Sequence, residues 1–201
     1  MRAIFEIFWG PPGLIFLGAI FGIIGALWSA HQQTGFEKAL RIKSDEIAEL
    51  NRTTFNAVTG GSSFCYFQIQ FDGLSGRFVF CHEGDNTLFD VTARIVNLDR
   101  FEQLKGNFTF ESFQHTDTIM PLGTMISGHA LFRGEIPVNQ LPKRGYNVFF
   151  TARNGAFSQL IRFAKTREGW AAAIKVTRDG RELFEKVDDD YPLGEGGTVD
   201  W

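Results

Sequence analysis

The side chains most capable of chemistry are two cysteines and four histidines, spread over 201 residues. Cys81 is followed directly by His82, but sequence neighbours on a strand point to opposite faces, so they do not form a nucleophile–base pair. Neither the i, i+4 spacing nor the Cys-x-x-Cys spacing of a zinc site occurs among His31, His82, His115 and His129. We therefore expect no catalytic residue, no metal, no cofactor and no enzymatic activity.

A disulfide is a second chemistry open to the cysteines, because Cys65 and Cys81 fall on the two strands of one predicted hairpin. With the turn centred near Leu74, Cys65 faces about position 83, and bridging to Cys81 requires a bulge or a register shift. Two buried thiols in a reducing compartment are the favoured interpretation, with the disulfide as the alternative.

The other polar motifs are expected to be surface features. The acidic stretch "DDDY" at 188–191 lacks the alternating ligands and glycine turn of a calcium loop. No Gly-x-Ser-x-Gly elbow is present, although a hydrolase site assembled from distant loops stays open. Arg94, Arg153 and Arg162 each interrupt an apolar strand, either as outward residues of a half-wet sheet or as a patch for anionic groups.

Before these residues lies a long apolar segment, because positions 7–30 carry no charged side chain. A helix over 11–30 would be about 30 Å long, which matches the hydrocarbon core of a bilayer. Trp9 and Trp28 would then lie at the two interfaces, with 1–10 as a short interfacial segment. A cleaved signal peptide is the rival, but Leu27 and Trp28 stand where it would have small residues. We therefore expect a retained single-pass signal-anchor.

One face of this helix is predicted to carry only small residues, which are Gly18, Gly22, Gly25 and Ser29. Such a stripe lets two membrane helices approach closely, so it favours a homo-oligomer, with a passive stripe as the alternative. Orientation follows from basic residues: only Arg2 precedes the helix, whereas Lys38, Arg41, Lys43 and Arg52 follow it. This bias predicts a plasma (inner) membrane protein whose carboxyl-terminal domain is cytoplasmic.

Residues 31–60 are predicted to form a helical stalk, with apolar residues at helical spacing at Phe36, Leu40, Ile47 and Leu50. Lys43 and Thr54 interrupt the heptad, so a short stalk is expected rather than a stable autonomous coiled coil. The glycines of "TGGSS" at 59–63 end the helix and mark a domain boundary.

The period changes to two from Phe64 onward, which predicts a β domain over 61–192 and a tail over 193–201. "FCYFQIQF" alternates, and "TLFDVTARIVNL" places Phe89, Val91, Ala93 and Ile95 on one face. Asn154-Gly155 and Asp179-Gly180 predict tight hairpin turns. Eight to ten strands without intervening helices predict antiparallel sheets, first as an immunoglobulin-like sandwich and second as a closed barrel.

The combination of membrane helix, short stalk, "NAVTGGSSFCYF", "LFDVTARIVNLD" and "ARNGAFSQLIRF" resembles a group of uncharacterised bacterial single-pass membrane proteins. The resemblance covers most of the chain past residue 45. Its motifs are turn and strand features, so it implies the architecture and no activity.

Composition narrows the function class. A formal net charge of −3 without a clustered basic footprint argues against nucleic acid. We expect a membrane-anchored, non-catalytic binding or assembly module with the bilayer and an unknown protein as its partners. The alternative is a small-molecule or lipid sensor, since the 22 phenylalanines could line a cavity as well as a core.

Overall fold

The structure is a computed structural model that describes residues 11–72, 75–104, 106, 109, 117–137 and 143–201. The chain divides into two compact units, residues 1–53 and 54–201. The first consists of the greater part of a long helix, and the second holds the last turn of that helix and all the strands.

Helix α2 (Pro11–Thr59) is continuous over both the predicted membrane segment and the predicted stalk. Thr34-Gly35 does not interrupt it, and the Thr34 hydroxyl donates back to the His31 carbonyl at 2.8 Å. The helix ends where Gly60 takes a φ of 103°, and the Gly60 N–H donates to the Asn56 carbonyl at 2.9 Å. A glycine in this conformation is the usual helix stop.

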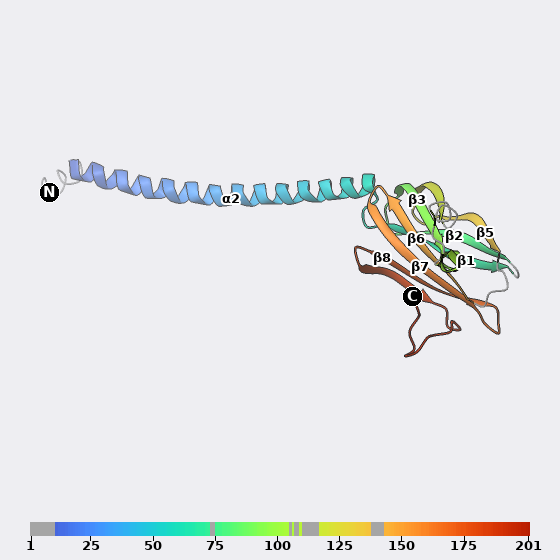
Figure 1. The fold of residues 1–201 in the computed structure, drawn as a ribbon. Helices are drawn as coiled ribbons and strands as arrows, with labels where there is room; N and C mark the ends of the chain where they lie inside the picture. The colour runs from blue at the N-terminus through green and yellow to red at the C-terminus, as the bar shows by residue number, and fades with distance from the viewer. Residues whose placement is uncertain (1–10, 73–74, 105, 107–108, 110–116, 138–142) are drawn as a thin grey trace. The chain divides into compact units, whose positions relative to one another are not determined.

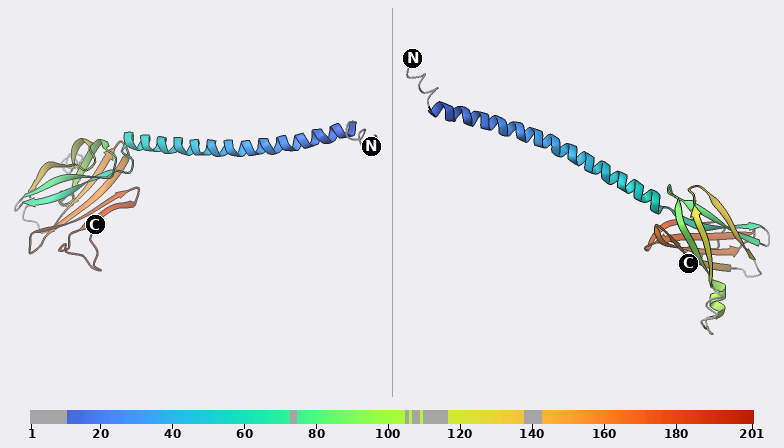
Figure 2. Two further views of the ribbon diagram at one scale, coloured as in Figure 1. Left: turned by 180° about the vertical axis from the view of Figure 1, so that it is seen from behind. Right: turned by 90° about the horizontal axis from the view of Figure 1, so that it is seen from above.

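Two antiparallel sheets make up the second unit (Figures 1 and 2). One has the order β1-β2-β5 and the other β4-β3-β6-β7-β8-β9. The strands are β1 (Phe64–Asp72), β2 (Ser75–Glu83), β3 (Leu88–Asn97), β4 (Asp117–Met125), β5 (Ala130–Pro137), β6 (Lys143–Ala152), β7 (Gly155–Lys165), β8 (Trp170–Arg178) and β9 (Arg181–Val187). The prediction of a mainly antiparallel β domain behind a long helix is therefore confirmed.

Aromatic side chains fill the space between the sheets. Phe67 lies at the centre, with ring centroids 3.6 Å from Phe80 and 5.6 Å from Phe150. Phe150 in turn stacks on Phe157 at 4.9 Å. Burying such rings is the main source of stability in a domain of this size.

The hairpin turns form as predicted in position, though not always in conformation. Asp179 and Gly180 both have positive φ, 51° and 75°, as the tight turn between β8 and β9 requires. In the hairpin of β6 and β7, Ala152 pairs with Gly155. The turn residues are thus Arg153 and Asn154, and Asn154 does not adopt the left-handed conformation that Asn-Gly favours in a two-residue turn.

A β-bulge corrects the predicted face of β3. Val91, Ala93 and Ile95 are buried as expected, but the register shifts between Leu88 and Val91, where Asp90 has a φ of 56°. An extra residue reverses the alternation. Leu88 therefore enters the core in place of Phe89, whose ring lies under the Arg153 guanidinium at 4.8 Å.

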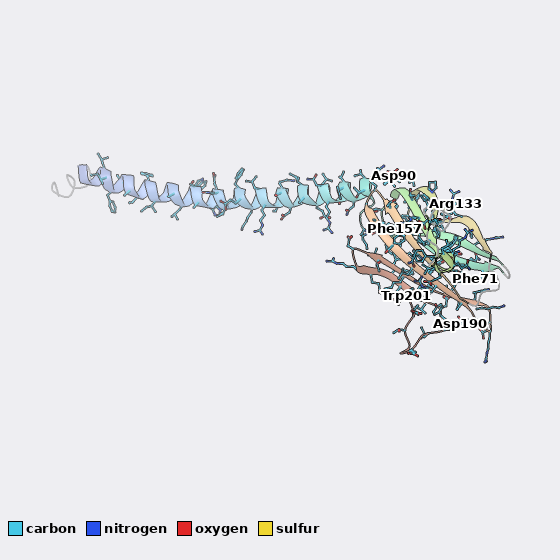
Figure 3. All side chains as sticks on the ribbon, in the orientation of Figure 1. Phe71, Asp90, Arg133, Phe157, Asp190 and Trp201 are labelled. Carbon is cyan, nitrogen blue, oxygen red and sulfur yellow. The ribbon has the colours of Figure 1, made fainter. Side chains whose placement is uncertain are left out.

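Two elements were not predicted, namely helix α3 (Leu98–Leu104) and strand β4. Asn97 caps α3 by accepting the Arg100 N–H at 3.2 Å, and Pro121 and Gly123 weaken the strand signal of β4. The stretch "NFTFESF" at 107–113, which the sequence also predicts as a strand, lies almost wholly outside the described residues. The predicted tail ends with Trp201, whose ring lies 5.6 Å from the Lys175 ammonium of β8 (Figure 3).

Candidate functional site

Strand β1 is an edge strand of its sheet, yet part of its outer edge is closed by a side chain of the opposite sheet. Gln159 of β7 is fully buried. Its Nε2 donates to the Phe67 carbonyl at 2.7 Å, and its Oε1 accepts the Phe67 N–H at 2.8 Å. The carboxamide thus does for Phe67 what a peptide group of a neighbouring strand would do.

The beginning of the same edge is closed in a similar way at Ser63. Asn154 Nδ2 donates to the Ser63 carbonyl at 2.7 Å and to the Gly61 carbonyl at 3.0 Å. Arg178 Nη2 donates to the Ser63 carbonyl at 2.9 Å. Burial lowers the pKa of the Arg178 guanidinium, an effect opposed by the nearby Asp179 carboxylate and Cys65. These bonds fasten the segment after helix α2 to the second sheet.

Ser63 also contacts the segment that follows β2. Its hydroxyl oxygen accepts the Asn86 N–H at 3.0 Å, and His82 Nε2 lies 2.8 Å from the Asn86 carbonyl. Gly84 packs so closely here that a Cβ at that position would lie 2.6 Å from Ser63 Oγ. The Ser63 hydroxyl is therefore fixed, buried and structural in its contacts, rather than a free nucleophile.

Farther along β1 the edge opens onto a groove of about 370 Å³. On β1 it lies between two aromatic stacks: Tyr66 on Phe184, with centroids 4.6 Å apart, and Phe71 on Trp170, 5.6 Å apart (Phe71 is labelled in Figure 3). The groove is lined by Gln68, Ile69, Gln70, Val79, Phe132, Ala172, Ile174, Lys186 and Asp188. We take this groove, called the β1 groove below, as the candidate binding site.

The wall opposite β1 mixes apolar and charged groups. Ala172 and Ile174 are buried. Asp188 Oδ2 accepts the Ala172 N–H at 2.8 Å, which fixes the end of β9 against β8. Lys186 is exposed at the rim. This combination can hold a ligand by hydrogen bonds and apolar contact, and it offers no arrangement of nucleophile and base.

The two cysteines are free thiols. Cys65 pairs with His82, one residue away from the predicted partner, and Tyr66 pairs with Cys81. Cys65 and Cys81 therefore point to opposite faces of the sheet, which is incompatible with a disulfide between them. Burial raises the pKa of both thiols, that of Cys65 far above its ordinary value, so neither is an activated nucleophile.

The three arginines that interrupt apolar strands each have their own partners. Arg94 pairs with Asp117, and Arg153 Nη2 pairs with Asp90 at 2.8 Å. Arg162 Nη1 donates to the Ile161 carbonyl at 2.9 Å and to Asn147 Oδ1 at 3.2 Å. These contacts favour outward residues of a half-wet sheet over a shared anion patch.

A second cavity, of about 320 Å³, lies where the C-terminal segment meets the sheet at Arg162. Asp99, Tyr191, Asp200 and Trp201 also line it. Burial raises the pKa of the Tyr191 hydroxyl and lowers that of the Arg162 guanidinium, while Tyr191 and Asp200 raise the latter. Two carboxylates beside one guanidinium leave no net positive charge for an anion, so this cavity is the weaker candidate.

The predicted helix-contact residues lie on a surface without neighbours in the described chain. A Cβ at Gly18, Gly22 or Gly25 would have nothing within 4 Å outside the helix itself. Trp28 is 69% exposed, and Trp9 lies outside the described residues. Their roles in helix contact and at the membrane interface stay predictions.

The sequence pattern did not identify Gln159, and it identified Asn154 only as a turn residue, not as a partner of Gly61 and Ser63. The available signal was in "AFSQLIRF", where Gln159 occupies an inward position between Phe157 and Ile161. A polar residue on an apolar face of a strand must find hydrogen-bond partners. Its partner is another strand's backbone 92 residues away, which the sequence pattern does not identify.

Within the described ranges, no three His, Cys, Asp or Glu side chains come together as a metal site would require. No family model matches the chain, and no curated protein or solved structure is significantly similar to it.

Proposed function

We propose that this protein is a membrane-anchored, non-catalytic binding or assembly module that holds a β-sandwich near the bilayer. The observation that carries the proposal is the apolar part of helix α2, which has a mean hydropathy of 2.1 and no residue buried against the described part of the chain. An apolar helix with no protein partner is far more stable in lipid than in water.

The flanking charges support a cytoplasmic β domain at the plasma (inner) membrane, since the basic residues Lys38, Arg41, Lys43 and Arg52 all follow the span.

The continuity of α2 supports self-association through one helix face. Gly18, Gly22 and Ser29 lie about five turns before Phe36, Leu40 and Ile47, respectively, so the small residues and the apolar stalk residues share a face. Phe36 and Ile47 are 66% and 59% exposed. A second copy of the helix, in close contact at the glycines and packed against the stalk, would cover both Phe36 and Ile47. Lys43 on the same face would weaken the packing between the two stalks.

Strand order supports the immunoglobulin-like interpretation of the sandwich. In a constant-type domain, strands 1-2-5-4 face strands 3-6-7. Here β1-β2-β5 faces a sheet in which β3-β6-β7 are neighbours, and β4 pairs with β3 instead of β5. The strand order is that of the same Greek key, except that the edge strand β4 belongs to the other sheet. β8 and β9 extend that sheet beyond β7.

A small-molecule sensor is the second candidate, and the β1 groove is the feature that favours it. The interior of the sandwich is occupied by rings such as Phe67, Phe80 and Phe150, so a ligand would bind at the margin of the sheets rather than between them.

The proposal is tested by membrane flotation and by reporters fused to both termini of the full chain. We expect the chain to float with membranes after carbonate extraction, with the C-terminal reporter active in the cytoplasm. A chain recovered in the soluble fraction would refute the anchor. An active periplasmic or extracellular C-terminal reporter would refute the orientation alone.

A further inference from the structure

Successive residues of β1 direct their N–H and C=O groups alternately toward β2 and away from it. The bonds of Phe67 show which residues direct these groups away from β2. β1 pairs with β2 from Phe64 to Asp72 without a register shift. Phe67 directs its N–H and C=O away from β2, toward Gln159. Because the antiparallel ladder has a period of two, Ile69 directs its N–H and C=O the same way.

Ile69 has no counterpart to Gln159. Among the described residues, no hydrogen bond reaches the outward N–H or C=O of Ile69, and β1 has no strand neighbour other than β2. Ile69 lines the β1 groove, so these outward groups lie beside it. An open donor and acceptor on a strand edge is a site for another strand.

The other sheet edges carry features that discourage strand addition. β4 contains Pro121, and β5 is bent at Gly134, where φ is 75°. β9 carries four charged residues, Arg181, Glu182, Glu185 and Lys186. By contrast, β1 has no charged residue from Phe64 to Phe71, although charges and prolines are the usual protection of an exposed edge.

We infer that the β1 edge at Ile69 binds an extended peptide segment of a partner protein, which adds a strand to the first sheet. This inference rests on the proposed binding function and gives its partner a chemistry. Gln159 on Phe67 shows, two residues away, that an amide group fits this edge. The groove of about 370 Å³ is at the small end of ligand sites, so it suits a few peptide residues.

The walls of the groove define which peptide fits. Buried Ala172 and Ile174 receive an apolar side chain, and Gln68 and Gln70 offer amides to its neighbours. The two aromatic stacks, at Tyr66 and at Phe71, limit the strand to the stretch between them. The partner segment is therefore short, extended and apolar at its centre.

Amide hydrogen exchange on the full chain in lipid nanodiscs tests the premise without any substitution. We expect the Phe67 amide to exchange at least about 100-fold more slowly than the Ile69 amide, since only the former is bonded. Equal protection of the two amides in the free chain would overturn the inference, because the edge would already be closed.

Binding is tested with an array of random ten-residue peptides probed with the same nanodiscs. Peptides that bind are then resynthesised with single backbone N-methyl groups. A strand that pairs with Ile69 loses affinity at one N-methyl position, that of the N–H that donates to the Ile69 carbonyl. It tolerates N-methylation of the two neighbouring residues, whose N–H groups point away from the edge. A small amide such as N-acetylalanine amide should compete only weakly, and full competition by it would assign the groove to small molecules instead.

Two substitutions at one position separate the backbone from the side chain. Ile69→Pro removes the outward N–H and spares the ladder to β2, whereas Ile69→Ala keeps the N–H and removes the larger side chain. We expect Ile69→Pro to weaken peptide binding about tenfold relative to Ile69→Ala. Equal affinity of the two variants, or an array without binders, would refute the inference.

These outcomes are separable from failure of the proposed function. A chain that binds array peptides at Ile69 yet does not float with membranes would refute the anchor and leave the edge site intact. A chain that floats with membranes but binds no array peptide would refute the edge site and leave the anchor intact.

Discussion

The carboxamide of Gln159 and the backbone of Phe67 form two hydrogen bonds, at 2.7 and 2.8 Å, across the space between the two sheets. Both residues are fully buried. A sheet edge inside a protein leaves donors and acceptors that water cannot reach, and each must be satisfied. One side chain thus closes the edge and fixes β1 in register against β7.

Replacing Gln159 with methionine should therefore destabilise the β domain strongly. Methionine has a similar length, but it leaves the Phe67 N–H and C=O buried without partners, at about 1–3 kcal/mol for each group. We expect a loss of about 2–4 kcal/mol in denaturant unfolding of the full chain in detergent. Ser158→Ala, which removes only a half-buried hydroxyl bonded to Thr177, is the control and should cost about 1 kcal/mol or less. Equal losses would show that the amide is not what holds β1.

Gly84 tests the packing around Ser63. Gly84→Ala places a Cβ 2.6 Å from Ser63 Oγ and also strains a φ of 106°. Gly155→Ala is the matched control, because its φ is 113° and nothing lies within 4 Å of its Cβ. Thermal unfolding should show a loss of about 1–2 kcal/mol for Gly155→Ala and about 2–4 kcal/mol for Gly84→Ala. If both variants lose the same amount, backbone strain alone matters at Gly84.

The sequence predicted the elements whose signals are local. Alternation in "FCYFQIQF", the stop at Gly60 and the Asp179-Gly180 turn each depend on a few adjacent residues, and all are found. The register of β1 and β2 was predicted one residue out, since it depends on the type of turn between the two strands, which the sequence leaves open. That single residue decides whether Cys65 and Cys81 share a face.

The candidate site was not predictable in the same way. The β1 groove depends on how β8 and β9 lie across the groove from β1, which also brings Tyr66 onto Phe184 and Phe71 onto Trp170. These pairs are more than 90 residues apart in the chain, and alternation says only that each ring is inward or outward. Tyr66 alternates with Cys65 and Phe67 and so lies on the same face as Gln68, yet it is buried because Phe184 of β9 stacks on it.

The raised thiol pKa of Cys65 predicts that stability falls in alkali. Above pH 9.0, the ordinary thiol value, the unfolded chain releases this proton while the folded chain keeps it. Unfolding is then favoured by about 1.4 kcal/mol per pH unit from this group. Tyr66 adds to the effect above pH 10.0, since burial, with Cys81 and Glu83 nearby, raises its pKa to about 12.

Denaturant unfolding between pH 7 and pH 11 measures this slope. Cys65→Ala should be less stable at pH 7, because it leaves a small cavity, but its stability should fall less steeply above pH 9. Identical slopes for the two proteins would show that Cys65 does not titrate as its burial requires.

Thiol labelling separates the two cysteines by exposure. Cys81 is half-buried and Cys65 fully buried, so an alkylating reagent at pH 8 should modify Cys81 first and Cys65 only on unfolding. Both should react slowly, because burial also raises the pKa of the Cys81 thiol. Mass spectrometry of peptides from the labelled full chain gives the order. A chain that requires reduction before either cysteine reacts would contradict the free thiols.

Gly22→Ile tests whether the small face of α2 pairs with a second copy. Isoleucine would hold the two helices apart where the glycine allows close approach, and it leaves residues 54–201 untouched. Gly13→Ile is the matched control: Gly13 lies about two and a half turns before Gly22, which places it on the opposite face. Native mass spectrometry in detergent should show an oligomer that Gly22→Ile weakens about tenfold and Gly13→Ile leaves unchanged. An oligomer that persists in both variants must be held together by another surface. If the unsubstituted chain is already monomeric, the small residues of α2 do not pair with a second copy.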